Sequence, residues 1–253
     1  MLIAGLQPNF WRGITDNDVA NGTQERCATW QYAGSNMVLK SIKDEAASAE
    51  NKAKIVASFD MPEQESQLEV TYEVLPNGYI GVNMHFIPGN KPLPEMPRLG
   101  MRMILKKDYD QMTWLGRGPQ ENYADRKSGY LIGKYSASVW EQYHPYVRAQ
   151  ETANKCDVRW FTLASKDGQG IKVEGDEPLS VSAWNFPQED LYYIPSMIER
   201  RHGGCIDKKD MVWVNIDHKQ MGVGGDNTWG AQVHPEYTIT PHEWSYGFVI
   251  MKK

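Results

Sequence analysis

The stretch that decides the fold runs from Gln67 to Ile87 and reads QLEVTYEVL-PNG-YIGVNMHFI. Apolar residues stand at every second position on both sides of the central PNG, and mostly polar residues stand between them. The apolar positions are Leu68, Val70, Tyr72, Val74, Ile80, Val82, Met84 and Phe86. Because successive side chains of a strand point to opposite faces, this alternation predicts two half-buried strands. The Pro76-Asn77-Gly78 turn predicts that they form a hairpin.

The same period of two recurs along the chain, with Gly-, Pro- and Asn-rich turns between the runs. It is found at Arg98–Leu105, Pro178–Trp184, Trp213–Ile216 and Trp244–Met251. A short helix is expected only within Gln188–Arg201, where Pro195 would interrupt it. Strands without long helices between them predict an all-β class and exclude a (β/α)8 barrel in this chain. We expect residues 1–253 to form a single large antiparallel sandwich of two sheets.

The composition argues against a nucleic-acid-binding protein and against a membrane-spanning one. The 253 residues carry a net charge of −5, without the clustered Lys and Arg of a nucleic-acid-binding surface. No apolar run is long enough to span a membrane. The apolar start, Met1 to Gly5, is too short for a signal peptide, so the compartment stays open.

Metal and redox chemistry have little support in the sequence. The cysteines are Cys27, Cys156 and Cys205; they form no C-x-x-C motif, and a buried free thiol is expected for each. The six histidines form no metal-binding spacing. The acidic run Asp16-Asn17-Asp18 lacks the rest of a calcium-binding loop. We therefore expect no metal and no cofactor.

Tryptophan is unusually frequent, with nine Trp against six Phe. Large aromatic side chains fill sandwich cores, and that is the expected role of most of them. The alternative is sugar binding, because a flat ring packs against the apolar face of a pyranose.

Three motifs lie in the long segments between predicted strands. They are Pro8–Asp18 (PNFWRGITDND), Trp114–Arg126 (WLGRGPQENYADR) and Gln220–Trp229 (QMGVGGDNTW). In this order and spacing they resemble the last domain of the β-galactosidases of glycoside hydrolase family 2, over nearly the whole chain. The resemblance implies a galactose-mutarotase-like supersandwich. It also implies that the other domains of a parent enzyme precede this one, among them a catalytic barrel.

The reaction implied by the resemblance is hydrolysis of terminal β-galactosyl bonds with retention. Such a reaction needs two carboxylates roughly 5–5.5 Å apart. In the resembling enzymes these glutamates lie on the barrel, which is absent here. The isolated chain is therefore expected to be inactive, with no catalytic residue of its own.

The best candidate for a substrate contact is Trp229, with Asp226 and Asn227 beside it. Gly222–Asp226 suits a tight exposed turn, because glycine tolerates positive φ. In the resembling enzymes the matching Trp stacks on the sugar of the leaving-group subsite. The alternative is that Trp229 anchors the loop on its own domain.

A second loop, Asp18–Arg26, resembles a segment beside the sugar site, with Asp18, Asn21 and Glu25 as possible contacts. The alternative for this loop is an ordinary surface turn.

Other polar residues of these segments have expected structural roles. Asp16 and Asn17 are expected to cap backbone amides in a turn, and Glu121 and Asp125 to pair with Arg117 and Arg126. Whether a sugar approaches Arg148, Gln150 and Glu151 is left open by the sequence.

Three functional hypotheses follow. The first is an accessory domain of a β-galactosidase, whose partners are the remaining domains of the parent enzyme and a β-galactoside at a composite site. The second is a free-standing carbohydrate-binding module. The third, an aldose 1-epimerase, needs an acid and a base at the anomeric centre, and no matching His and Glu pattern is found. An apolar surface beside Phe10 and Trp11 would favour the first hypothesis, because it would indicate a missing partner domain.

Overall fold

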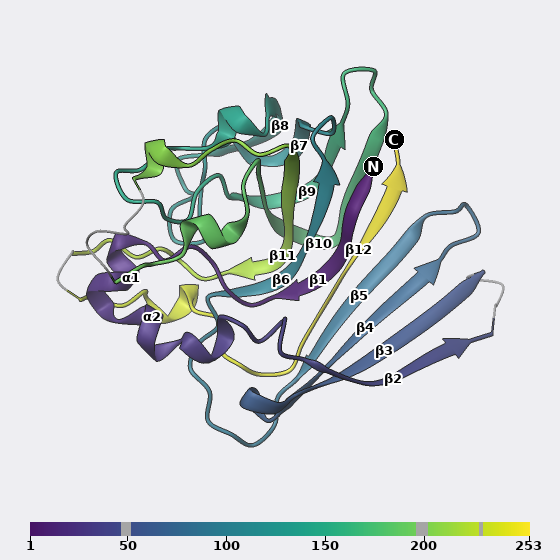
Figure 1. Ribbon diagram of the computed structural model, residues 1–253, viewed down its shortest axis with the longest axis horizontal. Helices are drawn as coiled ribbons and strands as arrows, with labels where there is room; N and C mark the ends of the chain where they lie inside the picture. The colour runs from purple at the N-terminus through teal and green to yellow at the C-terminus, as the bar shows by residue number, and fades with distance from the viewer. Residues whose placement is uncertain (47–51, 196–201, 228–229) are drawn as a thin grey trace.

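The computed structural model describes residues 1–46, 52–195, 202–227 and 230–253, and its secondary structure is almost entirely strand (Figure 1). The α-helices of the described residues are α1 (Asp16–Asn21) and α2 (Thr23–Arg26). The strands are β1 (Leu2–Asn9), β2 (Val38–Glu45), β3 (Ala53–Met61), β4 (Ser66–Val74), β5 (Ile80–Ile87), β6 (Arg98–Lys106), β7 (Gln111–Gly118), β8 (Leu131–Ser138), β9 (Lys155–Ala164), β10 (Gly170–Trp184), β11 (Met211–Gln220) and β12 (Trp244–Lys252). All of their pairings are antiparallel. The predicted all-β class is confirmed.

The predicted hairpin is formed by β4 and β5. Leu68 pairs with Phe86 and Val70 with Met84, so the alternating apolar residues of both strands share one buried face. Gly78 closes the turn with φ of +83°, a conformation that glycine adopts without steric cost.

The sheet follows the order β1-β6-β11-β10-β12-β5-β4-β3-β2, with β9, β7 and β8 branching from β10. The first half of β10, from Ile171 to Gly175, pairs with β12, whereas its second half, from Ser180 to Trp184, pairs with β11. Against β9 the register shifts between Glu174 and Leu179, where β10 is bulged and exposed. Strands that bend in this way carry a sheet round a corner. The two layers of the sandwich are therefore parts of one sheet, joined through β10.

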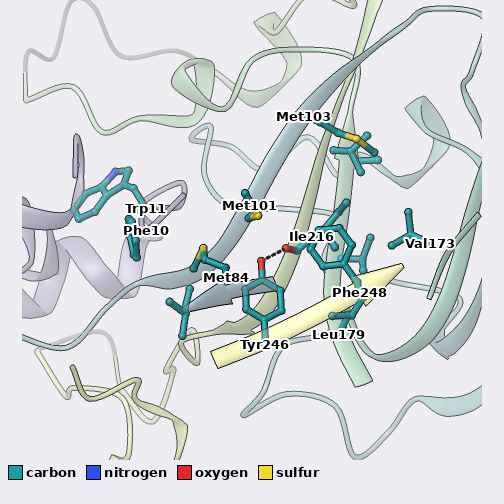
Figure 2. Packing of buried hydrophobic residues seen from close by; sticks show 14 of the residues in the cluster. Phe10, Trp11, Met84, Met101, Met103, Val173, Leu179, Ile216, Tyr246 and Phe248 are labelled. Atoms are coloured by element: carbon teal, nitrogen blue, oxygen red, sulfur yellow. Dashed lines mark hydrogen bonds between the residues drawn. The ribbon is translucent and has the colours of Figure 1, made fainter. Parts of the chain in front are cut away.

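The core lies between these layers and contains many of the aromatic residues. Figure 2 shows Met84, Met101, Ile216, Tyr246 and Phe248 packed together, with the Tyr246 hydroxyl donating to the Ile216 carbonyl at 2.9 Å. The tryptophans that are almost fully buried are Trp11, Trp30, Trp114 and Trp184. For these four, the expectation of a core role is confirmed.

The helices agree only in part with the expectation from the sequence. A short helix was expected within Gln188–Arg201, and the described part of that segment contains a 3-10 helix at Gln188–Leu191. The segment Asp18–Arg26, expected to be a loop, is mostly helical, because it overlaps α1 and contains α2.

The reason for α1 is a capping box. The Thr15 hydroxyl accepts from the Asp18 amide at 3.1 Å, and the Asp18 carboxylate accepts from the Thr15 amide at 2.9 Å. Gly22, with φ of +73°, ends the helix. The expected capping role of Asp16 and Asn17 thus belongs to Thr15 and Asp18.

The cysteines are free thiols, and their burial differs. Cys27 and Cys156 are buried as expected, whereas Cys205 is exposed because it lies on the 3-10 turn Gly203–Cys205. Among the described residues, no helix has the length and hydropathy to cross a membrane.

Candidate functional site

The glycine-rich loop that follows β11 is held by Asp125. Its carboxylate accepts hydrogen bonds from the amides of Val223, at 3.0 Å, and Gly224, at 2.7 Å. A Cβ at Gly222 would lie 2.6 Å from the same carboxylate, so the close approach requires glycine there. Asp125 was expected to pair with Arg117 or Arg126; instead, it binds two successive amides of this loop.

Arg12 anchors the start of the loop from below. Its guanidinium donates to the carbonyls of Met221, at 2.7 Å, and Gly222, at 3.0 Å. It also binds both carboxylate oxygens of Asp18, at 2.9 and 3.0 Å. The side chains of Arg12 and Asp18 have no exposed area. Buried charges of this kind persist only when they are paired and hydrogen-bonded.

Asp18 was a possible sugar contact, and its position makes it a scaffold residue instead. Both of its oxygens are engaged inside the protein, so it fixes α1 to the loop and does not reach solvent.

The two predicted site loops lie side by side. The Asn17 side-chain amide on α1 donates to the Val223 carbonyl at 3.0 Å, and that of Asn21 donates to the Ala231 carbonyl at 3.4 Å. Asn21 is half-buried, and Glu25 is exposed on α2. The structure therefore places Asn21 next to the loop that follows β11.

The exposed part of the glycine-rich loop carries Asp226 and Asn227. The Asp226 carboxylate lies 2.5 Å from Nε2 of His234, and this hydrogen bond raises the pKa of His234. The Asn227 side-chain oxygen accepts from the Ala231 amide at 3.2 Å. Trp229 lies outside the described residues, between these two closing interactions in sequence.

The segment that carries Arg148 and Gln150 is tied to the start of α1. Arg148 donates to the Asp16 carboxylate at 2.6 Å and to the Ile14 carbonyl at 2.8 Å. Gln150 donates to the same carboxylate at 3.1 Å. Asp16 therefore joins two loops.

Glu151 belongs to a buried cluster of charges beneath the site. Arg98 binds Glu151 at 2.9 Å and Asp217 at 2.5 Å, and none of the three side chains is exposed. Burial, with a smaller contribution from Glu151, raises the pKa of Asp217 to about 8 against the opposing effect of Arg98. Because neither carboxylate has any exposed area, a sugar cannot reach them.

Glu121 and Arg117 form ion pairs near the site, one as expected and one with a different partner. Glu121 pairs with Arg126 at 2.9 Å, as expected, and also accepts from the Ala153 amide at 2.8 Å. Arg117 was expected to pair with Glu121 or Asp125, but it binds Asp157 at 2.5 Å. Asp157 lies on β9, which faces Arg117 on the paired strand β7.

A hollow of about 260 Å3 lies against the same elements. It is lined by residues of α1, of the glycine-rich loop and of the segments before and after β8, among them Asp16, Asn17, Tyr123, Tyr146 and Val223. Within the described part of the chain, no group of three or more His, Cys, Asp or Glu side chains is placed to hold a metal ion.

A family comparison assigns this arrangement to a known group. The sequence model described as "Beta galactosidase small chain" matches residues 1–250. The chain belongs to this β-galactosidase small chain family.

Relatives of this small chain are much longer proteins. A β-galactosidase of Priestia megaterium is 36% identical over 242 residues, which cover 94% of this chain but 22% of the relative. A β-galactosidase of Lactobacillus delbrueckii subsp. bulgaricus is 35% identical over 231 residues, with 91% and 22% covered. The chain thus spans about a fifth of the length of these relatives.

Among solved structures, a GalM/aldose epimerase homologue from C. elegans overlaps 85% of this small chain and 69% of its own, with 6% identity and a TM-score of 0.41. A likeness of that degree supports no inference about activity.

Proposed function

We propose that this small chain is an accessory domain of a retaining β-galactosidase, in which it supplies one wall of a composite active site. That wall is the loop from Met221 to Val233. In this proposal Trp229 stacks on the sugar of the leaving group, Asp226 and Asn227 bind its hydroxyl groups, and the catalytic glutamates lie on other domains.

The observation that carries the proposal is that hydrogen bonds with the side chains of Arg12 and Asp125 fix the start of the loop while its later residues are exposed. Buried groups hold its start, because Asp125 binds two of its amides and Arg12 two of its carbonyls. Its tip is presented outward, with the Asp226 side chain 62% exposed. A binding residue works best when the backbone beneath it is fixed by such supporting contacts.

The neighbouring helix supports the same assignment. Asn17 and Asn21 fasten α1 to the loop, so both segments that the resemblance places near a sugar form one surface. Asn21 and Glu25 remain candidates for direct contacts, whereas the buried Asp18 acts only through the backbone that it holds.

Asp217 and Glu151, the buried carboxylates that bind Arg98, have no exposed side-chain area. We therefore expect the isolated chain to leave a chromogenic galactoside intact. Measurable turnover by the isolated chain would overturn this part of the proposal.

The test of the loop is Trp229→Ala in the complete β-galactosidase that carries this chain, with Trp229→Phe as the conservative variant. Stacking lost from the leaving-group subsite should lower kcat/KM about 10-fold for lactose, equivalent to about 1.4 kcal/mol. Because a small leaving group has no ring to stack, methyl β-galactoside should lose much less. Trp229→Phe should recover most of the activity on lactose.

Trp160→Ala is the control, since Trp160 lies on β9 away from the loop. Equal losses on both substrates, or no loss on either, would remove Trp229 from the site. Calorimetry of the isolated chain with galactose completes the test, because tight binding there would favour a carbohydrate-binding module.

A further inference from the structure

The face of strands β2 to β5 that is turned toward the core carries apolar side chains well beyond the buried part of the sheet. One cross-strand row runs from Met84 on β5 through Val70 and Ala57 to Ile42 on β2. The adjacent row runs from Val82 through Tyr72 to Ile55 and ends at Asp44 on β2. Apolar side chains thus follow the first row to the edge of the sheet and the second row as far as β3.

Toward the edge of the sheet, the apolar side chains of these rows are no longer covered by other parts of the protein. Met84 and Val70 are buried, whereas Ile42, in the same row, is 62% exposed. The other exposed members of this face are Leu39, Ile55, Val74 and Ile80, at 51%, 41%, 36% and 40%. Figure 1 shows the reason: β2 to β5 fan away from the rest of the sandwich, and β2 forms the outer edge. We call these five residues the open inner face.

The opposite face of the same strands has the chemistry of a solvated surface. Lys54 on β3 pairs with Glu45 and Glu73, and Ser58 donates to Glu69 at 2.9 Å. An antiparallel sheet with one polar and one apolar face normally has its polar face in water and its apolar face packed against another part of the structure. Exposed apolar patches of this kind mark interaction sites.

We propose that the open inner face is the surface on which the remainder of the β-galactosidase chain packs. This inference rests on the proposed function and names the place where the partner domains make contact. The open inner face does not involve Phe10 and Trp11, which are 1% and 2% exposed and lie in the core.

The length of the relatives favours this occupant. They match nearly all of this chain, yet the matched part is 22% of their length, so about four-fifths of each lies elsewhere. A covalently attached segment covers a patch at high effective concentration and avoids most of the cost of association between separate molecules.

A second copy of this chain is a weaker candidate. Each partner of a standard stable interface contributes about 800 Å² and roughly 20–30 residues, far more than five side chains provide. The net charge of −5 on each copy also opposes self-association.

The experiment compares Ile42→Lys with Val38→Lys. Both residues lie on β2 and are similarly exposed, at 62% and 55%, but Val38 pairs with Asp60 on the polar face. In the complete β-galactosidase, Ile42→Lys should lower the melting temperature of the enzyme by about 2–4 °C, because it places an unpaired charge in an interface. Val38→Lys should leave that temperature nearly unchanged.

In the isolated 253-residue chain the two variants should unfold at nearly the same temperature, since both positions face water there. Binding of an apolar fluorescent dye should fall in Ile42→Lys only. Hydrogen exchange at β2 should be slower in the complete enzyme than in the isolated chain.

Equal melting temperatures of the two variants in the complete enzyme would overturn the proposal. So would a stable dimer of the isolated chain that Ile42→Lys dissociates, which would assign the face to a second copy. Failure here is distinguishable from failure of the proposed function, because Trp229→Ala alters substrate dependence and Ile42→Lys alters stability.

Discussion

Asp217 on β11 lies opposite Gly100 on β6, and the absence of a side chain at Gly100 makes room for the Asp217 carboxylate. A Cβ at Gly100 would lie 1.9 Å from Oδ1 and 2.7 Å from the Cα of Asp217. The buried charge cluster around Arg98 therefore depends on a glycine of the neighbouring strand.

Replacement of that glycine should be costly. Gly100→Ala forces β6 and β11 apart or displaces the carboxylate from Arg98, and we expect a loss of about 2–4 kcal/mol in the free energy of unfolding. Urea denaturation followed by fluorescence measures it. Gly5→Ala on β1 is the control, because nothing lies within 4 Å of its added Cβ. Similar effects of the two substitutions would contradict the steric argument.

The protonation of Asp217 should make stability depend on pH. Its pKa is about 8 in the folded protein, well above the 3.8 of an unperturbed carboxyl, so between these values the folded state holds a proton that the unfolded state has released. The stability contributed by this group is full below about pH 4 and is lost as the pH rises towards 8. Asp217→Asn should flatten that slope. Unfolding free energies at pH 5, 6, 7 and 8 test this, and parallel curves for the two proteins would refute it.

The Arg12–Asp18 pair should be worth far more than an ion pair at the surface. Asp18→Ala leaves a buried guanidinium without its partner and removes the α1 cap, and should cost about 3–5 kcal/mol. The double variant Arg12→Met with Asp18→Leu should be less destabilised than the sum of the two single changes. The exposed pair Lys107–Asp210 is the comparison, and Asp210→Ala should cost about 0–1 kcal/mol. Additive single changes would show that the pair is not coupled.

The three thiols should differ in reactivity. Burial raises the pKa of Cys27 and of Cys156 to about 12, so both lack thiolate at neutral pH as well as access. Cys205 is exposed. One equivalent of a thiol reagent should react with the native chain at pH 8 and three after denaturation. Loss of the fast reaction in Cys205→Ser identifies the site, and rapid labelling of a second thiol in the native chain would argue against this assignment.

Alternation predicted β4, β5, β6 and β12 and parts of β10 and β11, because it follows directly from the pleat when one face is buried. It did not predict β7, although burial alternates along that strand too. The hairpin of β4 and β5 is the clearest case. The strand β2 was missed since its sequence, VLKSIKDE, contains a bulge at Lys40 that breaks the period of two. The helix α1 was missed because its capping box uses Asp18 in place of the more familiar Glu or Gln.

The site was readable only in part. Motif resemblance singled out both the glycine-rich loop and the segment of α1 as candidates, and the structure places them in contact through Asn17 and Asn21. The role of Asp125 in holding the loop could not be predicted from the sequence, because Asp125 lies almost a hundred residues from the amides that it binds. Long-range pairing of single polar residues leaves no periodic trace in a sequence.

The strand β10 has a consequence for how the molecule comes apart. The strand β12 is hydrogen-bonded to the first half of β10 and β11 to its second half. Because both layers share this strand, neither layer can unfold without disrupting the other. Heating should therefore release the whole molecule in one transition, and cleavage of the exposed stretch from Asp176 to Pro178 should split that transition in two.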